Sequence, residues 1–278
     1  MALRILALGD IVGRPGRQIV CQKLGQLVRE KKVDLVIANG ENIAGGSGIT
    51  TNLFHKLRSY GVDVVTLGDH VFKKADIVPT LVASERILRP ANLSQQAAGR
   101  LYTVVTTESG VKVAVFALLG RIYVNLPADD PFAAADRVLQ QLPPGVKCCV
   151  VDVHAEASSE KVAMGHHLDG RVSFIYGTHT HIPTADAKIL AGGSAYSSEV
   201  GMCGPYDAVL GRRKERVLKY MTTNMPAQFE IATGDVRMCG ALAEIDPETG
   251  RAVSIERIEV CGGNAEQADD AQRGQHLE

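Results

Sequence analysis

Residues 5–28 read ILALGDIVGRPGRQIVCQKLGQLV, and this segment sets the pattern for most of the chain. The apolar run 5–8 predicts a strand that ends at Gly9-Asp10. Pro15 favours the first turn of a helix, and the residues after it place apolar side chains at helical spacing, at 19, 20, 24, 27 and 28. A strand followed by an amphipathic helix is the first half of a βαβ unit.

The alternation of strand and helix continues along the chain and changes after residue 100. Residues 35–38 and 62–67 are predicted strands, with a helix around 53–57 between them. The runs 101–107 and 111–118 are separated by Glu108-Ser109-Gly110, which is typical of a hairpin between antiparallel strands. Helices are then predicted at 133–142 and 158–168, strands at 148–153 and 172–176, and mostly β-structure from Ile189 onward. The sequence therefore predicts a layered α/β or α+β sandwich with a mixed sheet.

The chain is predicted to form a single domain over residues 1–261. Its 278 residues, of which 45% are hydrophobic, suffice for one large domain, and we find neither an internal repeat nor a linker that divides it. Residues 262–278 are polar, with Leu277 as their sole large apolar residue. We expect this segment to be a disordered tail, because it cannot bury itself.

Composition and charge restrict the classes of function. The formal net charge is -1, so no general excess of Lys and Arg exists to neutralise a phosphate backbone, and we expect no stable binding to nucleic acid. A small anionic ligand is compatible with this charge. The N-terminal residues lack the pattern of a signal peptide, and no apolar stretch reaches about 18 residues, the length of a membrane span. We therefore expect a soluble, cytoplasmic protein with no membrane partner.

The six cysteines show neither a CxxC pair nor the spacing of a disulfide framework. This pattern favours reduced, structural thiols over a redox or zinc role. Cys148 and Cys149 lie in an apolar run, where neighbouring side chains point to opposite faces of a strand. We expect both to be buried as small apolar groups.

Acidic residues and histidines follow the predicted strands at several points that are far apart in the sequence. They occur in GDIVG, NGEN, GDH, VDVH and GTHTH, and the residues concerned are Asp10, Glu41, Asp69, His154, His179 and His181. Sites in open α/β sheets gather at the carboxyl ends of the strands, so these side chains can share one pocket. Carboxylate and imidazole ligands together suit Mn, Fe, Zn or Co better than Ca or Mg alone. The pattern predicts a polynuclear metal site, although a histidine taken alone is more often a packed or surface residue.

The segment GTHTH allows two arrangements of its histidines. Residues two apart point the same way only while the backbone stays extended. If the chain instead turns after Gly177, His179 and His181 diverge and can serve two neighbouring metals.

A series of motifs resembles the YmdB-type branch of the calcineurin-like metallophosphoesterases. The motifs occur in order between about residues 3 and 260, namely GDIVGRPG (9–16), NGEN (39–42), LGDH (67–70), RPAN (89–92), VDVHAEASSEK (151–161), DGR (169–171), GTHTHIPTAD (177–186) and GMCGPYD (201–207). Each motif alone is a weak signal, whereas the ordered combination is specific. The resemblance implies an α/β/β/α metallophosphoesterase sandwich with mixed sheets.

The resemblance also implies a role for each site residue. A first metal would be held by Asp10, Asn42 and His181, a second by Asp69, His154 and His179, and Glu41 would bridge both. A metal-bridging hydroxide would attack the phosphorus, and His70 would protonate the leaving oxygen. The cofactors would be two divalent or mixed-valence ions, with iron or manganese favoured and zinc as an alternative. Val12 stands where the wider superfamily has the histidine of its DxH motif, which is why Asn42 is needed as a ligand.

One departure from the branch changes the charge of the site, because the branch has Asn where this chain has Asp69. The net charge of two divalent cations together with Asp10, Glu41 and a bridging hydroxide is plus one. The third carboxylate lowers this net charge to zero. We therefore expect a weaker attraction for an anionic phosphodiester, or a preference for a more highly charged ion such as ferric iron. A second departure follows His70, where the branch has aromatic and acidic residues and this chain has Val71, Phe72 and Lys73. The loss of acidic residues there affects what holds His70 in place.

The resemblance implies a homo-oligomeric phosphodiesterase of small substrates, in particular 2′,3′-cyclic nucleotides. The physics of the sequence alone reaches only metal-dependent phosphoester hydrolysis. Two other classes stay open, namely a metal-stabilised regulatory or nucleotide-sensing protein with little turnover, and a metal-assisted hydrolase of amides or esters. Arg14, Arg17 and Arg89 are predicted near the rim of the site, where phosphate steering and surface exposure are equally compatible with the sequence. The histidines that we do not expect to bind metal are His55, His166, His167 and His276.

Overall fold

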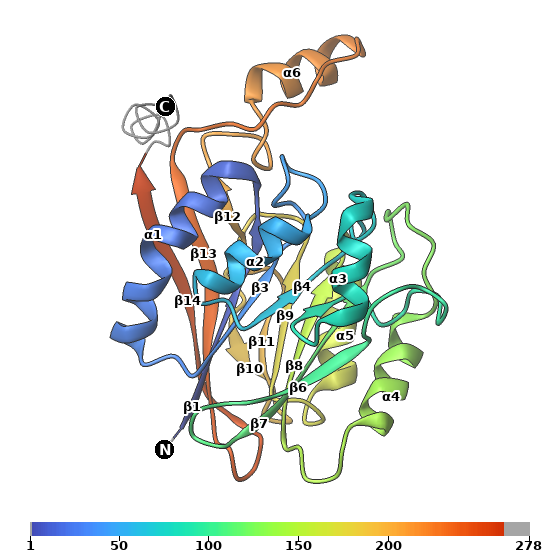
Figure 1. Cartoon of the computed structure of the whole chain (residues 1–278), viewed down its shortest axis with the longest axis vertical. Helices are drawn as coiled ribbons and strands as arrows, with labels where there is room; N and C mark the ends of the chain where they lie inside the picture. The colour runs from blue at the N-terminus through green and yellow to red at the C-terminus, as the bar shows by residue number, and fades with distance from the viewer. Residues whose placement is uncertain (1, 264–278) are drawn as a thin grey trace.

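The computed structural model describes residues 2–263, whose strands form two sheets (Figure 1). The first sheet has eight strands in the order β2-β12-β13-β1-β3-β4-β5, and β14 also pairs with β13. These strands are β1 (Leu3–Leu8), β2 (Asp10–Ile11), β3 (Leu35–Asn39), β4 (Val64–Thr66), β5 (Ile87–Leu88), β12 (Met202–Pro205), β13 (Val236–Ile245) and β14 (Ala252–Gly263). The second sheet has six strands in the order β10-β11-β9-β8-β7-β6, which are β6 (Tyr102–Thr106), β7 (Lys112–Leu119), β8 (Cys148–His154), β9 (Phe174–Thr178), β10 (Lys188–Ile189) and β11 (Ala195–Ser197).

Both sheets are mixed, which confirms and extends the prediction of a mixed sheet. In the first sheet β1, β3, β4 and β5 are parallel neighbours, whereas β13 runs antiparallel to β1. In the second sheet β7, β8 and β9 are parallel, and β6 and β7 form the antiparallel pair predicted around Glu108-Ser109-Gly110. Parallel neighbours end at the same edge of a sheet, and this edge carries the candidate site.

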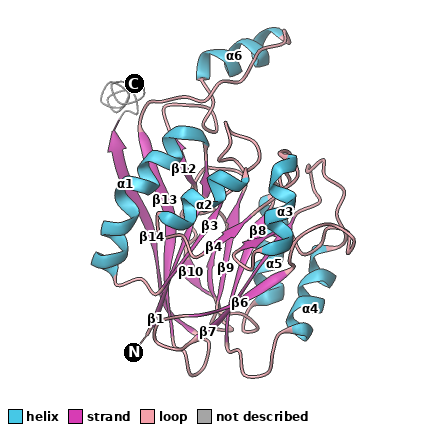
Figure 2. Cartoon of the chain, viewed as in Figure 1, coloured by secondary structure: helices cyan, strands magenta, loops and turns pink. Residues whose placement is uncertain are grey.

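Helices cover the outer faces of the two sheets, which gives four layers (Figure 2). The first sheet is covered by α1 (Gly13–Lys31), α2 (Thr51–Ser59) and α3 (Val78–Ala83), and the second by α4 (Pro131–Gln141) and α5 (Ser158–Leu168). Side chains alternate between the cores, so that in β1 Ile5 belongs to the core between the sheets and Leu6 to the core under the helices. The α/β/β/α sandwich implied by the resemblance is therefore confirmed.

The cysteines of the apolar run behave as predicted. Cys148 lies in the core between the sheets, and Cys149 lies in the core under α4 and α5. Burial raises the pKa of the Cys148 thiol to about 11. All six cysteines are free thiols, and Cys21 and Cys261 are exposed.

Some short elements differ from the prediction. The helix α6 (Lys214–Thr223) follows β12 and precedes β13 in the sequence, within the region predicted as mostly β. It lies apart from the sandwich (Figure 2). Val217 is its one buried residue, and its other large apolar side chains, Leu218, Tyr220 and Met221, are exposed, so α6 contributes little to a core. The strand β5 and the short helices η1 (Ala75–Ile77) and α3 were also not predicted, because two to six residues carry too little periodicity.

The end of the described chain also differs from the prediction. Gly262 and Gly263, which we predicted as the start of a tail, instead extend β14, and Gly263 pairs with Val236 of β13. The rest of the predicted tail, residues 264–278, lies outside the described residues. Within residues 2–263, no helix has the length and apolarity needed to cross a membrane.

Candidate metal centre

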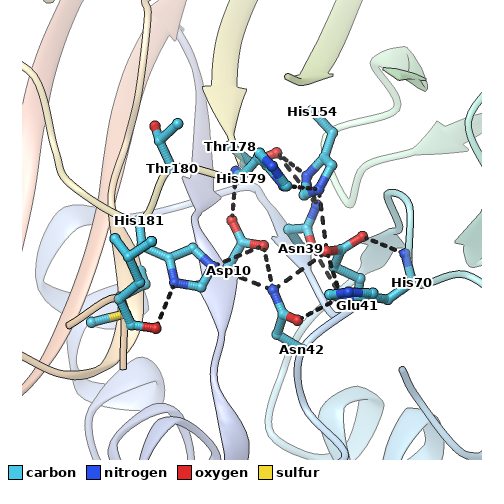
Figure 3. A network of polar contacts seen from close by, with 12 residues as sticks. Asp10, Asn39, Glu41, Asn42, His70, His154, Thr178, His179, Thr180 and His181 are labelled. Atoms are coloured by element: carbon cyan, nitrogen blue, oxygen red, sulfur yellow. Dashed lines mark hydrogen bonds and ion pairs between the residues drawn. The ribbon is translucent and has the colours of Figure 1, made fainter. Parts of the chain in front are cut away.

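The candidate site lies where parallel strands of both sheets end (Figure 3). It brings together all eight residues singled out in the sequence. Asp10 follows β1, Glu41 and Asn42 follow β3, Asp69 and His70 follow β4, His154 ends β8, and His179 and His181 follow β9. Apart from Arg4 in β1, every residue of these strands is buried, so the last residues of each strand have a fixed position from which the polar side chains project.

Four of these residues form one group. The ligand atoms of Glu41, Asp69, His154 and His179 all lie within 4.8 Å of one another. His154 Nε2 lies 3.2 Å from both Glu41 Oε1 and Asp69 Oδ1. His179 Nδ1 lies 3.0 Å from His154 Nε2 and 3.5 Å from Asp69 Oδ1. Two carboxylates and two imidazoles that converge in this way are a donor set suited to a transition metal.

A second group lies beside the first and consists of Asp10, Asn42 and His181. Asn42 Nδ2 lies 3.1 Å from Asp10 Oδ1 and 3.3 Å from His181 Nε2. It also lies 3.4 Å from Glu41 Oε1, so Glu41 borders both groups. Ligation by Asn42 would use its side-chain oxygen, which faces His70 in the structure. Rotation of the amide by half a turn exchanges its oxygen and nitrogen, so the side chain can present either atom to a metal.

The histidines of GTHTH point into different groups because the backbone turns between them. His179 has φ 94° and His181 has φ 64°, a left-handed conformation that is uncommon outside glycine and clusters at functional sites. Thr180 holds the turn, since its backbone N–H and its hydroxyl both donate to Glu199 Oε2, at 3.0 and 2.6 Å. Of the two arrangements open from the sequence, the diverging one is present.

A buried ion pair between Lys161 and Glu199 stabilises this turn. Lys161 Nζ donates to Glu199 Oε2 at 2.8 Å and to Thr180 Oγ1 at 3.1 Å. The side chains of Lys161 and Glu199 are 3% and 2% exposed. Burial raises the pKa of Glu199, and the charge of Lys161 partly opposes this rise. The pair therefore positions Thr180 and, through it, both histidines.

A second buried network orients the ring of His154. Its Nδ1 lies 2.8 Å from Thr178 Oγ1, and the Thr178 hydroxyl donates to Asp152 Oδ1 at 2.7 Å. Because that hydroxyl has one proton to give, His154 Nδ1–H must donate to Thr178, which leaves Nε2 free for a metal. Asp152 also accepts from Thr66 Oγ1 at 2.5 Å and from Asn39 Nδ2 at 3.2 Å. Burial raises the pKa of Asp152 to about 6.

His70 lies beside both groups and is partly exposed. Its Nδ1 lies 2.9 Å from Asn42 Oδ1 and 3.2 Å from Glu41 Oε1, and its backbone N–H donates to Glu41 Oε2 at 3.2 Å. The hydrogen bond with Glu41 raises the pKa of His70, which favours a protonated ring near neutrality. The side chains of Phe72 and Lys73 are exposed, so the imidazole of His70 is held by Glu41 and Asn42 rather than by these two side chains.

Negative charge accumulates in the site. The carboxylates of Asp10, Glu41 and Asp69 form ion pairs with histidines, and none of the three pairs with a Lys or Arg of residues 2–263. Burial would raise the pKa of Asp10 and Glu41, but the histidines lower both to about 2. Burial would lower the pKa of His154, but the carboxylates raise it well above the usual value. A divalent cation would replace these protons and neutralise the carboxylates.

The glycine of LGDH provides the space that the site needs. A Cβ atom at Gly68 would collide with the imidazole of His154 and with the carboxylate of Glu41. Any larger residue here would therefore push two potential ligands apart.

Some contacts of the site were not predicted from the sequence. Glu156 Oε2 lies 3.2 Å from His179 Nε2, and the Leu210 carbonyl lies 3.2 Å from His181 Nδ1. A single loop carboxylate has no sequence signature, and a backbone carbonyl has none at all. The histidines expected to be outside the site follow the prediction where they are described, since His167 Nε2 pairs with Asp136 of α4 at 3.0 Å, and His55 lies on α2. His276 lies outside the described residues.

The chain matches the protein family described as YmdB-like protein over residues 6–258. A protein of Bacillus subtilis (strain 168) named 2′,3′-cyclic-nucleotide 2′-phosphodiesterase is 41% identical over 256 residues, which cover 92% of this chain and 96% of that protein. The crystal structure of a hypothetical protein from Thermus thermophilus has a TM-score of 0.86 at 37% identity, over 93% of this chain and 99% of that one. The crystal structure of a novel phosphatase of Mycoplasma pneumoniae has a TM-score of 0.88 at 30% identity, over 97% of each chain.

Proposed function

The chain belongs to the YmdB-like protein family, and from this membership and the geometry of its site we propose that it is a metal-dependent phosphodiesterase of 2′,3′-cyclic nucleotides. The observation that carries the proposal is the pair of ligand groups with Glu41 between them. A site for one structural metal would need neither the second group nor a partly exposed histidine beside it. The name of the Bacillus subtilis relative supports the choice of substrate.

The residues present fit two metal ions. Asp10, Asn42 and His181 would hold one ion, and Asp69, His154 and His179 the other, with Glu41 shared. When bound, a pair of divalent ions supplies polarisation of the phosphoryl oxygens and a low pKa for a coordinated water. The ligand residues would fix where the ions lie, and therefore where a phosphodiester would bind relative to His70. No nucleophilic side chain is required.

His70 is the proposed proton donor. Its pKa is raised by Glu41, so the ring holds a proton under conditions where the leaving oxygen needs one. Asn42 and Glu41 bind Nδ1, and the other ring nitrogen lies 3.6 Å from Asp69 Oδ2, so the ring has a defined orientation. The hydrogen bond at Nδ1 and the ion-pair contact at Nε2 keep the imidazole beside the two ligand groups, and neither group includes it as a ligand.

An assay panel tests the proposal. The purified protein is given phosphomonoesters, linear phosphodiesters, 2′,3′-cyclic and 3′,5′-cyclic nucleotides, and a carboxylic ester, each with added Mn and after chelation. We expect hydrolysis of 2′,3′-cyclic nucleotides that is lost on chelation and regained with metal. Hydrolysis of the carboxylic ester while every phosphodiester stays intact would contradict the proposal and favour an amide or ester hydrolase.

Asp69 favours a second candidate function. With its carboxylate the charge of a doubly occupied site falls to zero, which weakens attraction for an anionic substrate. A metal-stabilised nucleotide sensor with little turnover is compatible with this charge. Tight binding of cyclic nucleotides by calorimetry, without metal-dependent hydrolysis in the panel, would support the sensor.

The proposal extends to the metals, assembly and location. We propose iron or manganese as the native ions, with zinc as the alternative, a homo-oligomeric assembly, and a place in the cytoplasm. Elemental analysis, light scattering and cell fractionation test these three points. Native metals other than iron, manganese or zinc would contradict the first point. A monomeric protein would contradict the second, and recovery of the protein in the membrane fraction would contradict the third.

A further inference from the structure

A cavity outside the metal centre is lined by residues of β6 and α4. These two elements lie at one edge of the sandwich (Figure 1). Its volume is about 620 Å³, within the range of small-molecule sites. The segment after β5, the strand β6 and one face of α4 line it, and no residue of the metal centre does. A ligand here would therefore occupy a site of its own.

The floor of this cavity holds a buried arginine without a carboxylate partner. Arg89, which we predicted near the rim of the metal site, is 2% exposed and lines the cavity. Its Nη1 donates to the carbonyls of Pro90 and Leu93 at 2.9 and 3.5 Å. Its Nε has no hydrogen-bond partner among residues 2–263. A guanidinium offers five N–H groups, so most of the donors of Arg89 are unused by this part of the chain.

This arrangement is costly unless something else binds Arg89. A buried charge without a counter-ion is destabilising, and natural proteins pair such groups or place them where a ligand completes them. Burial lowers the pKa of Arg89, and no acidic residue raises it. Arginine nevertheless stays protonated in proteins, so the cavity has a fixed positive charge at its floor.

The mouth of the cavity adds positive charge. Arg100 and Arg137 are exposed and line it. Arg100 is paired with Glu85 at 2.8 Å, whereas Arg137 has no ion pair within residues 2–263. Three arginines and one glutamate give the lining an excess of positive charge. Guanidinium groups recognise phosphate and carboxylate through two parallel hydrogen bonds.

The remaining lining suits an organic body rather than a bare ion. Val104 and Val138 contribute apolar surface, and Tyr102 contributes an aromatic ring whose hydroxyl is fixed on the carbonyl of Gln141 at 3.0 Å. Aromatic faces of this kind bind planar groups. From the cavity, the buried Arg89 and the unpaired Arg137, we propose a second binding site for a small organic anion, with a phosphate or carboxylate held by the arginines and a planar body beside Tyr102.

Calorimetric titration of three probes tests the site, namely inorganic phosphate, adenosine 5′-monophosphate and citrate. The titrations use the unaltered protein and Glu41→Ala, because phosphate groups can also bind at the metal centre. We expect binding that persists in Glu41→Ala and becomes at least about tenfold weaker in Arg137→Gln, the loss of one charge-assisted pair. Arg29→Gln is the matched control, because Arg29 is also an exposed arginine on a helix but lies on α1, outside the cavity.

The probes separate the sources of the anion. Tighter binding of the nucleotide supports a phosphate ligand, and tighter binding of citrate supports a carboxylate ligand. Inorganic phosphate that binds as well as both would overturn the organic part of the proposal. Equal affinities in Arg137→Gln and Arg29→Gln, or no binding by any probe, would overturn the site itself.

Hydrogen exchange on the unaltered protein provides a second measurement that needs no variant. We expect the tightest probe to protect residues 99–104 and 134–141. Protection confined to the segments of the metal centre would overturn the proposal.

Discussion

Replacement of Lys161 by Met tests how the buried ion pair supports the histidine turn. Lys161 and Glu199 are almost completely buried and 2.8 Å apart, and breaking such a pair costs about 3–5 kcal/mol of the free energy of unfolding. Glu199 keeps three donors, from the N–H and hydroxyl of Thr180 and the N–H of Gly201, so its charge is still partly compensated. We therefore expect a loss at the lower end, about 3 kcal/mol.

Urea unfolding of four proteins measures this loss. They are the unaltered chain, Lys161→Met, Lys161→Met/Glu199→Gln and the control Lys147→Met, in which an exposed lysine loses its 3.5 Å pair with Glu248. The double variant should regain about 2 kcal/mol because no buried charge remains, and the control should change by about 0.5 kcal/mol or less. Because burial raises the pKa of Glu199, the loss in Lys161→Met should shrink as the pH falls and Glu199 takes up a proton. A loss as small as that of Lys147→Met would refute the stabilising contribution of the pair.

Four further outcomes are expected. His70→Gln should lower kcat by about 10²–10⁴-fold with unchanged metal content, the usual size of a general-acid contribution, and an unchanged kcat would exclude the proton-donor role. Asp69→Asn should lower KM for 2′,3′-cyclic nucleotides or shift the metal content away from ferric iron, and a variant unchanged in both would remove the charge argument. Gly68→Ala should lose metal by elemental analysis because its Cβ would displace His154 and Glu41, and full retention would show that the site adapts. Dialysis from about pH 7.5 to about pH 5 should release metal, because the raised pKa values of His154 and His181 let protons compete for the ligand atoms, and constant metal content would contradict this.

The long elements of the fold could be predicted because their apolar residues form continuous runs in the strands and recur at helical spacing in the helices. In β1 and β8, alternate residues enter different cores, and α1 repeats its apolar residues at helical spacing, so the sequence pattern and the packing agree. The helix α6 could not be predicted in this way, because it leaves the sandwich and buries little besides Val217. Two glycines carry no local signal for a strand. The pairing of Gly263 depends instead on Val236 of β13, which lies far away in the sequence.

The candidate ligands could be predicted because acidic and histidine residues at strand ends are conspicuous against apolar runs. The residues that contact and orient these ligands could not be predicted. Asp152 lies within the apolar run of β8, and its partners are Thr178 of the neighbouring strand and Thr66 of the other sheet, so the network depends on how the two sheets pack. Lys161 and Glu199 are separated by 38 residues, and either one alone reads as a surface charge. The burial of Arg89 could not be predicted from the sequence either, because it depends on the elements that pack around this side chain.

Metal content measured together with activity tests the central claim most directly. Elemental analysis of the purified protein and of Glu41→Ala is combined with an assay of 2′,3′-cyclic nucleotide hydrolysis on the same samples. The account predicts two metal equivalents and turnover in the unaltered protein, and a loss of at least one equivalent together with turnover in Glu41→Ala. Two equivalents retained in Glu41→Ala, or turnover by a protein that contains no metal, would contradict it.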